Sequence, residues 1–324
     1  MRAVVVDELM ETGDLRVSEA AECQAGEGEV VIAVRAAGCN FSDLLMLKGE
    51  YQVKPTLPFI PGREAAGRVL EVGGGVDRVK PGDRVLAYTD LGAFAERVCV
   101  HQAQVFRLPD SMSFEVGAAL PIVYPTSYAA LVDLAAIRPG ETLLVHAAAG
   151  GVGLAAVQIG RALGARVVAT AGGPEKLEVA RRAGAEVLID YREVDFAPRV
   201  LAETGGRGAD VIYDPVGGET TDRSLRCIAW KGRLVIVGFA SGQIPEIRGN
   251  RIMLKNIAVL GLNWPRYREE EPDRVDAILR ALMDLHAEGQ IEPLIESVHP
   301  LEEVGIALAA LARRGTVGKR VLIP

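Results

Sequence analysis

The chain has 324 residues, of which 49% are apolar and 24% are charged, a mixture typical of a globular protein with about two domains. Acidic residues outnumber basic ones by 43 to 36, and the net charge of −7 argues against a nucleic-acid partner. The four cysteines form no Cys-x-x-Cys pair, so neither a disulfide framework nor a thiolate zinc site is expected, and a reducing cytoplasm is the expected compartment.

Two apolar stretches, 116–137 and 143–160, are long enough to be weighed as membrane spans. Pro121 and Pro125 interrupt the first, and four glycines together with His146 interrupt the second. A buried strand, loop and helix accounts for the second stretch better than a span does. No membrane span is therefore expected.

The N-terminal part of the chain, 1–123, consists of short β-type segments separated by turns. The turns carry Gly73-Gly74-Gly75 and Pro81-Gly82-Asp83. Strands are expected at 29–33, 66–72, 83–87 and 95–100. Short strands with glycine and proline turns between them favour a β-rich domain.

At Thr142 the pattern changes to strands that alternate with helices. Pro174 suits the first turn of one of these helices. Helices are expected at 152–163 and 174–182, and strands at 142–146, 166–170, 186–189, 210–213, 233–237 and 257–260. This alternation predicts an α/β fold with a doubly wound parallel sheet of six strands, and we place this domain at 124–264.

The remaining tail, 265–324, returns to mixed character. It has expected helices at 273–288 and 301–313 and a last strand at 319–323. The tail is too short to be a domain by itself. We therefore assign it to the N-terminal domain as its second part.

A glycine loop, Ala147-Ala148-Ala149-Gly150-Gly151-Val152-Gly153, follows the first strand of the α/β part and opens a helix. Against the pattern Gly-x-Gly-x-x-Gly, Ala148 stands at the first glycine position, and Gly150 and Gly153 at the other two. Gly150 would let a pyrophosphate approach the backbone, and Gly153 would let the helix pack close to the strand. The alternative is a plain tight turn, but the strand–loop–helix context favours a dinucleotide site that includes residues 149–153.

The end of the second strand carries information about the cofactor's ribose. An NAD enzyme usually has an acid there that binds the 2′-hydroxyl. This chain has Ala169-Thr170-Ala171-Gly172-Gly173, with no carboxylate before Glu175. A 2′-phosphate would not be repelled at Gly172 and Gly173, and Lys176 lies one helical turn further on, although it is equally explained as a solvated helix residue. The pattern favours NADPH.

At this point the chain resembles a known family. The stretch His146–Gly164, HAAAGGVGLAAVQIGRALG, is similar to the cofactor loop of zinc-independent NADPH:quinone oxidoreductases of the zeta-crystallin type, in the medium-chain dehydrogenase/reductase superfamily. Further matching stretches follow in the family's order: Asn40-Phe41-Ser42-Asp43, Gly49-Glu50-Tyr51, Pro61-Gly62-Arg63-Glu64, Pro81-Gly82-Asp83-Arg84-Val85, Gly92-Ala93-Phe94-Ala95-Glu96 and Asp214-Pro215-Val216-Gly217-Gly218. The resemblance implies a GroES-like catalytic domain in two parts, 1–123 and 265–324, a Rossmann domain between them, and a homodimer that pairs along strand 257–260.

The same stretches bear on zinc. Zinc alcohol dehydrogenases carry a cysteine and a histidine ligand where this chain has Asn40 and Arg63, and Cys39 is one place out of register. The lobe of four cysteines that holds a structural zinc is replaced by the short link 86–91. Without soft or imidazole ligands a tetrahedral zinc site is not expected, so we expect no metal.

The resemblance also implies cofactor contacts. Two of the implied residues also have a purely structural explanation: Tyr191 as a packed aromatic side chain, and Arg314 as a residue that interacts with the carboxyl end of its helix. Some relatives have a tyrosine near the cofactor where this chain has Leu45, which makes the pocket more apolar. The implied contacts are Asn40, Thr126, Gly238, Phe239, Ala240 and Asn263 for the nicotinamide end, and Lys176, Tyr191 and Arg314 for the 2′-phosphate.

Without a metal to polarise a carbonyl, hydride transfer suits acceptors that are already electron-poor. The leading prediction is therefore reduction of quinones, small-molecule electron acceptors, by NADPH. Candidate proton donors or orienting groups are Tyr51, Asn40 and Asp43, with Tyr51 first because its phenol can donate, and with water as the alternative source.

Two alternative functions share much of this pattern. One is an NADPH-dependent enoyl reductase that acts on enones or acyl thioesters, although no continuous basic patch for a thioester carrier is visible. The other is a non-catalytic NADPH-binding protein with a structural or RNA-binding role, against which the acidic net charge weighs. Turnover with an acceptor would separate the enzymes from the binding protein.

Overall fold

Six parallel strands form one sheet of the computed structural model, which describes residues 1–324. The strands are β8 (Thr142–Val145), β9 (Arg166–Ala171), β10 (Val187–Asp190), β11 (Ala209–Asp214), β12 (Ile228–Ile236) and β13 (Ala258–Gly261). They lie in the order β10-β9-β8-β11-β12-β13. The chain thus leaves β8 in one direction and returns beside it in the other, which places a topological switch point between β8 and β11. The predicted doubly wound sheet of six strands is confirmed.

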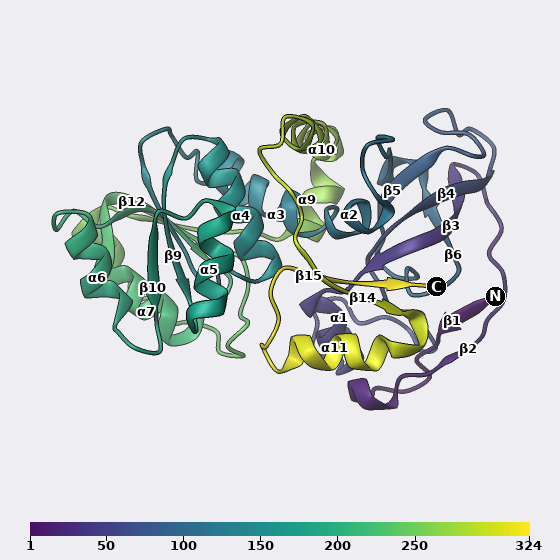
Figure 1. Ribbon diagram of the computed structural model, residues 1–324, viewed down its shortest axis with the longest axis horizontal. Helices are drawn as coiled ribbons and strands as arrows, with labels where there is room; N and C mark the ends of the chain where they lie inside the picture. Colours follow the sequence, from purple (N-terminus) through teal and green to yellow (C-terminus); the bar gives the residue numbers. More distant parts are fainter. The chain divides into compact units, whose positions relative to one another are not determined.

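Helices cover both faces of this sheet. Figure 1 shows α4 (Gly151–Ala162) and α5 (Pro174–Ala183) on one side, and α6 (Phe196–Glu203) and α7 (Gly218–Cys227) on the other. The short α8 (Gly249–Lys255) precedes β13. Because both faces are covered, the central strands are buried and read as nearly continuous apolar runs. The two helices predicted at 152–163 and 174–182 correspond to α4 and α5.

Four further helical segments belong to the same unit, Val123–Glu292, called here the α/β unit. They are α3 (Val123–Tyr128), the π-helix η3 (Ala129–Leu134), α9 (Trp264–Glu270) and α10 (Pro272–Ala287). The Asp133 carboxylate of η3 accepts hydrogen bonds from the Tyr267 hydroxyl at 2.5 Å and from Arg274 Nε at 3.0 Å. These bonds hold α9 and α10 in the α/β unit, whereas the sequence pattern assigned the part of the chain after 264 to the catalytic domain.

The other unit, Met1–Ile122 with Pro293–Pro324, is called here the β-rich unit. Its seven-stranded sheet has the order β14-β15-β3-β4-β5-β7, and β6 pairs with β3. The strands are β3 (Glu29–Gly38), β4 (Glu64–Val72), β5 (Arg84–Tyr88), β6 (Arg97–His101), β7 (Val105–Arg107), β14 (Ile295–Pro300) and β15 (Lys319–Ile323), and β1 (Arg2–Val4) pairs with β2 (Val17–Glu19). Short helical segments connect them: η1 (Thr12–Asp14), α1 (Phe41–Leu47), η2 (Gln102–Gln104), α2 (Phe114–Ala119), η4 (Leu301–Glu303) and α11 (Val304–Ala312).

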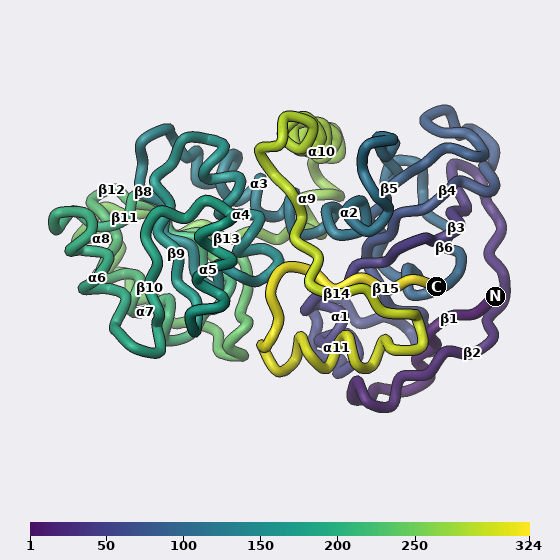
Figure 2. Tube along the Cα trace, viewed as in Figure 1, coloured from purple at the N-terminus to yellow at the C-terminus, as the bar shows by residue number.

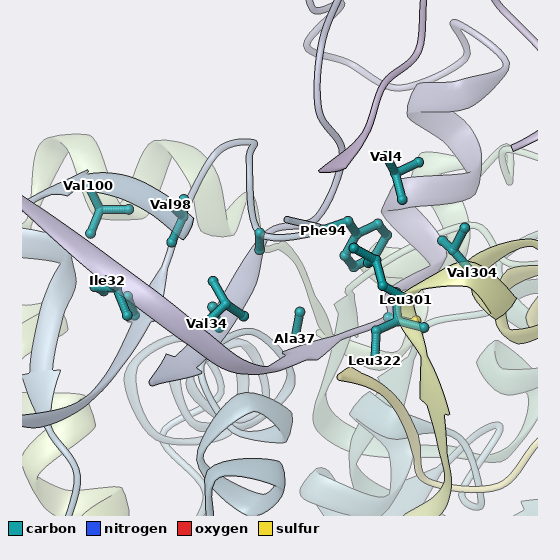
Figure 3. Packing of buried hydrophobic residues seen from close by; sticks show 14 of the residues in the cluster. Val4, Ile32, Val34, Ala37, Phe94, Val98, Val100, Leu301, Val304 and Leu322 are labelled. Carbon is teal, nitrogen blue, oxygen red and sulfur yellow. The ribbon is translucent and has the colours of Figure 1, made fainter. Parts of the chain in front are cut away.

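The C-terminal tail completes this sheet. Strand β15 runs antiparallel to β3, with Val321 opposite Gly38, and Figure 2 shows the yellow tail beside the purple strand. Leu301, Val304 and Leu322 pack into one apolar core with Val4 and Phe94 of the N-terminal part, as Figure 3 shows. Burial of these side chains therefore joins two segments that are far apart in the sequence. No helix of either unit has the length and apolar character that crossing a bilayer requires.

Candidate functional site

The glycine loop joins β8 to α4 at the carboxyl edge of the sheet, beside the topological switch point. Ala148 and Ala149 are buried, and Gly150, Gly151 and Val152 are partly exposed at the start of α4. The first backbone N–H groups of a helix have no partner within it and face away from its end, so they can receive an anion. The structure thus brings the predicted residues 149–153 together at a helix N-terminus.

Steric space distinguishes the glycines of this loop. A Cβ atom on Gly153 would lie 2.2 Å from the carbonyl oxygen of Ala147, so the close approach of α4 to the loop requires glycine there. A Cβ atom on Gly150 would meet nothing closer than that same oxygen, at 3.4 Å. Gly153 is therefore needed for the fold of the loop, and Gly150 leaves space that a bound pyrophosphate can use.

His146, for which the sequence predicted no role, lies directly before the glycine loop and fixes it through two side-chain hydrogen bonds. Its Nδ1 lies 2.9 Å from Thr170 Oγ1 and its Nε2 lies 2.8 Å from Ser224 Oγ. Because the Ser224 hydroxyl donates to the Thr220 carbonyl at 2.7 Å, Ser224 Oγ must accept from His146 Nε2–H, which makes Nδ1 the acceptor for Thr170. Burial lowers the pKa of His146 to about 4, and the charge of Asp214 opposes this shift. The imidazole is thus a neutral crosslink between β8, β9 and α7.

The end of β9 shows what surrounds the predicted 2′-phosphate position. A Cβ atom on Gly172 would lie 2.7 Å from both Arg192 Nε and Tyr191 Oη, so these two exposed side chains lie over that glycine. The Asp190 carboxylate accepts hydrogen bonds from the backbone N–H groups of Gly173 and Arg192, each at 2.9 Å. These bonds stabilise its negative charge within the turn. Arg192 was missed by sequence reasoning, and its place directly after Tyr191 was the available signal.

The other two phosphate candidates lie at helix ends. Lys176 is partly buried in the first turn of α5, whose N-terminus follows Gly173. Arg314 belongs to the β-rich unit, where it follows α11 as an exposed residue with a backbone φ of 55°. Of the predicted set, Lys176 and Tyr191 therefore both lie near the end of β9.

The predicted nicotinamide contacts of the α/β unit lie on the loops that follow β12 and β13. Gly238, Phe239 and Ala240 follow β12, and the Ala240 N–H donates to the Pro215 carbonyl at 3.0 Å. Asn263 follows β13 and its side-chain oxygen caps α9 by accepting from the Arg266 N–H at 3.2 Å. Carboxyl ends of parallel strands share one edge of a sheet, so these loops lie on the edge that carries the glycine loop. Thr126, in α3, is buried.

Asp214 shapes a turn at the same edge. Its carboxylate accepts from the backbone N–H groups of Val216 at 2.9 Å and Gly217 at 3.0 Å, and from the Thr221 hydroxyl at 2.5 Å. Gly217 and Gly218 have φ values of 76° and 55°, which other residues rarely adopt. The motif 214–218 is therefore a structural turn that supports the loop after β12.

In the β-rich unit, Asn40 forms hydrogen bonds to both members of a buried ion pair between Lys319 and Glu64. Lys319 Nζ donates to Glu64 Oε1 at 2.6 Å and to Asn40 Oδ1 at 2.8 Å, and Asn40 Nδ2 donates to Glu64 Oε1 at 2.8 Å. Glu64 is fully buried and Lys319 is 4% exposed. Asn40 Nδ2 has a second acceptor in the Gly38 carbonyl at 3.3 Å. The amide of Asn40 is therefore engaged at both ends, and Lys319, a charged residue that begins an apolar strand, was missed by sequence reasoning.

Tyr51 lies against Arg63. The Arg63 guanidinium donates from Nη1 to the Tyr51 hydroxyl oxygen at 2.8 Å, and its carbon lies 5.1 Å from the centre of the phenol ring. Arg63 is 4% exposed, and its Nε has no partner. The structure thus places a permanent cation directly beside the first candidate proton donor.

Asp43, the third candidate, is fully buried in the first turn of α1. Its Oδ2 accepts from the Asn40 backbone N–H at 2.7 Å, whereas its Oδ1 has no partner. Burial raises the pKa of Asp43 to about 7, and the positive charges of Arg63 and Lys319 oppose this rise. The buried site therefore favours the neutral form of this carboxyl group more than water does.

A separate hollow with a volume of about 630 Å³ lies in the β-rich unit. Its lining is mostly apolar and includes Phe59, Ile60 and Val98. No candidate site residue contributes to this lining. The hollow is therefore not part of the arrangement described above.

Comparisons with known proteins agree with both units. Residues 26–110 match the family model "Alcohol dehydrogenase GroES-like domain", and residues 151–280 match "Zinc-binding dehydrogenase". The mouse "Quinone oxidoreductase-like protein 2" is 37% identical over 322 residues, which cover 99% of this chain and 91% of that protein. The human "Synaptic vesicle membrane protein VAT-1 homolog" is 34% identical over 327 residues, covering 96% and 82%. The crystal structure of Escherichia coli quinone oxidoreductase complexed with NADPH matches with a TM-score of 0.93 at 33% identity and covers 100% of both chains. The expected GroES-like and Rossmann folds are confirmed.

The residues do not fit a zinc centre, although one matching family model is described as zinc-binding. Asn40 and Arg63 stand at the expected ligand positions, and the Lys319 ammonium lies 2.8 Å from Asn40 Oδ1, where it would repel a metal ion. Burial raises the pKa of the neighbouring Cys39 thiol, which disfavours the thiolate form that binds metals. No group of three or more His, Cys, Asp or Glu side chains converges anywhere in residues 1–324.

Proposed function

Because the chain belongs to the quinone oxidoreductase-like proteins of the medium-chain dehydrogenase/reductase superfamily, we propose that it is a reductase that uses NADPH to reduce quinones without a metal. The observation that carries the proposal is the glycine loop at the switch point of the sheet, where Gly153 leaves no space for a side chain. Such a loop offers backbone N–H groups and a helix N-terminus to a pyrophosphate. When NADPH is bound it supplies the hydride.

The preference for NADPH over NADH rests on the surroundings of Gly172. Arg192 and Tyr191 lie over this glycine, and Lys176 follows in the first turn of α5. A guanidinium that binds a phosphate oxygen contributes about 1.5–3 kcal/mol, and less where water screens the pair. We therefore assign the 2′-phosphate to Arg192, Tyr191 and Lys176, with Arg314 as a further candidate from the family resemblance.

The preference for quinones rests on the side chains that replace the metal ligands. Neither Asn40 nor Arg63 provides a Lewis acid, so the chemistry favours acceptors that are already electron-poor. Of the three candidate donors, Tyr51 is best supported, because its oxygen accepts from Arg63 and no protein group receives its proton. Asn40 is fully engaged with Glu64 and Lys319, so its proposed role is to orient that pair, and Asp43 is proposed as a reserve acid.

The proposal includes a homodimer in a reducing compartment such as the cytoplasm. Strand β13 is at the edge of its sheet, and Val259 and Leu260 on it are only partly buried. An unpaired apolar edge favours pairing with a second copy. All four cysteines are free thiols, as a reducing compartment requires. A single species of dimeric mass in light scattering, which Leu260→Lys converts to a monomer, is the expected result.

The decisive experiment is turnover by metal-stripped protein, followed by loss of NADPH absorbance. Parallel reactions contain 1,4-benzoquinone, 9,10-phenanthrenequinone, an enone or crotonyl-CoA, and each is repeated with NADH. We expect quinone reduction that survives chelation and is faster with NADPH. Reduction of the enone or thioester alone would move the assignment to an enoyl reductase, and tight NADPH binding with no turnover would favour a non-catalytic binding protein.

A further inference from the structure

Arg63 holds Tyr51 by two side-chain contacts at once. Its Nη1 donates to the Tyr51 hydroxyl oxygen at 2.8 Å, and the guanidinium also lies over the ring, with 5.1 Å between its carbon and the ring centre. Tyr51 lies in the loop after α1, outside any helix or strand. Its backbone N–H donates to the Leu45 carbonyl. The side-chain contacts that fix the phenol come from Arg63.

The direction of this hydrogen bond determines the state of the phenol. A guanidinium only donates hydrogen bonds and keeps its charge at every physiological pH. The Tyr51 oxygen must therefore accept, and its own proton remains available to another acceptor. A neutral partner such as a glutamine could reverse the bond and take up that proton, whereas Arg63 cannot.

The position of Arg63 is itself well defined. Its carbonyl accepts from the Thr89 N–H at 2.7 Å, and its side chain is 4% exposed directly before β4. The neighbouring carboxylate of Glu64 is already neutralised by Lys319, at 2.6 Å. Besides Glu64, Asp43 is a buried carboxyl group, whose pKa is raised by burial and lowered by the charge of Arg63, but no ion pair joins Asp43 and Arg63. The cation beside Tyr51 is thus only partly compensated.

We propose that Arg63 is a positioning residue that aims the Tyr51 hydroxyl proton at the acceptor and stabilises the negative charge left on the Tyr51 oxygen. This inference rests on the proposed quinone reductase function. Hydride addition converts the quinone into a hydroquinone anion. The Tyr51 O–H bond then breaks as a new O–H bond forms on the anion, and the Tyr51 oxygen regains a proton from water. The sum is quinone, NADPH and one proton giving hydroquinone and NADP⁺.

The test is a double-mutant cycle of Arg63→Gln and Tyr51→Phe, read as kcat and KM for benzoquinone and as the Kd of NADPH. Loss of a positioned general acid typically costs about 100-fold or more in rate, so we expect kcat to fall about 100-fold in Tyr51→Phe and about 10-fold or more in Arg63→Gln. In the Tyr51→Phe background, Arg63→Gln should cause no further loss. The Kd of NADPH should stay unchanged, and Arg63→Lys, which keeps the charge and a donor, should recover part of kcat.

The matched control is Arg68→Gln. Arg68 also lies over an aromatic ring of the β-rich unit, Phe114, at 6.0 Å, but it is outside the proposed machinery. Its kcat should equal that of the wild type. Equal kcat in Arg63→Gln and the wild type, or an equal loss from Arg63→Gln with and without Tyr51, overturns the inference while the proposed function stands. Silence of the wild type with every acceptor overturns both. If Arg63→Gln does not fold, Arg63→Lys against Arg63→Lys/Tyr51→Phe provides the same comparison.

Discussion

The neutral imidazole of His146 should make the stability of the α/β unit depend on pH. Burial lowers the pKa of His146 to about 4, against 6.5 for an unperturbed histidine. Between these two values the unfolded chain binds a proton that the native state does not bind. Stability therefore rises with pH in this window and is lost as pH falls from about 6.5 through about 4.

The size of the effect follows from the same two values. They differ by about 2.5, and one pKa unit corresponds to about 1.36 kcal/mol, so the expected loss is about 3 kcal/mol. The structural reason is the pair of hydrogen bonds: His146 already donates from Nε2 to Ser224 and accepts at Nδ1 from Thr170. A second proton would remove the acceptor and place an unpaired charge in a fully buried site.

Tryptophan fluorescence is the suitable assay, because both tryptophans of the chain, Trp230 and Trp264, belong to the α/β unit. Trp264 is only 5% exposed and stacks on Tyr267 with 5.7 Å between ring centres, so unfolding should change its emission. Urea unfolding of the intact protein is followed by this signal at several pH values between about 4 and 7.

His146→Gln is the control, since glutamine keeps one donor and one acceptor but does not titrate. The other three histidines are unchanged in it, so the difference between the two pH profiles isolates His146. We expect the wild type to lose about 3 kcal/mol more than the variant between neutral and acidic pH. Parallel profiles for the two proteins would refute the reasoning.

Three further predictions concern the cofactor site and the buried ion pair. Gly153→Ala should destabilise the loop and weaken NADPH binding, because its Cβ would lie 2.2 Å from the Ala147 oxygen, whereas Gly150→Ala should weaken binding with little loss of stability. Fluorescence titration with NADPH measures the binding and thermal unfolding measures the stability of each variant. Equal stabilities of the two variants would contradict the steric argument. Arg192→Gln should raise the Kd of NADPH about 10-fold and leave that of NADH unchanged, and an equal effect on both cofactors would rule out a phosphate contact. Lys319→Met should cost about 3–5 kcal/mol in the unfolding of the β-rich unit, measured by circular dichroism, because it leaves the Glu64 carboxylate buried without its cation. Lys319→Met/Glu64→Gln should recover part of that loss, and no recovery would show that the charge is not the cause.

Local patterns in the sequence were sufficient for the α/β sheet and its glycine loop. Most of the strands are short apolar runs, and α4, α5 and α7 begin at glycine or proline, so these elements are specified by their own residues. The loop is equally local, since Gly150 and Gly153 lie within one turn of each other. The end of the α/β unit was different, because Asp133 holds Tyr267 and Arg274 from more than 130 positions away.

The sequence by itself thus determined the six strands of the α/β sheet in chain order, the nucleotide loop and the replacement of zinc ligands by Asn40 and Arg63, because local residue patterns define each of these. Only the tertiary structure decided which polar groups meet. His146 meets Ser224 across 78 positions, and Lys319 meets Glu64 across 255. Such pairs carry no periodic signal, because a hydrogen bond between distant residues depends on how the sheets bring their strands together. The same reason explains why Arg63 was visible as a missing ligand but became a partner of Tyr51 only in the folded chain.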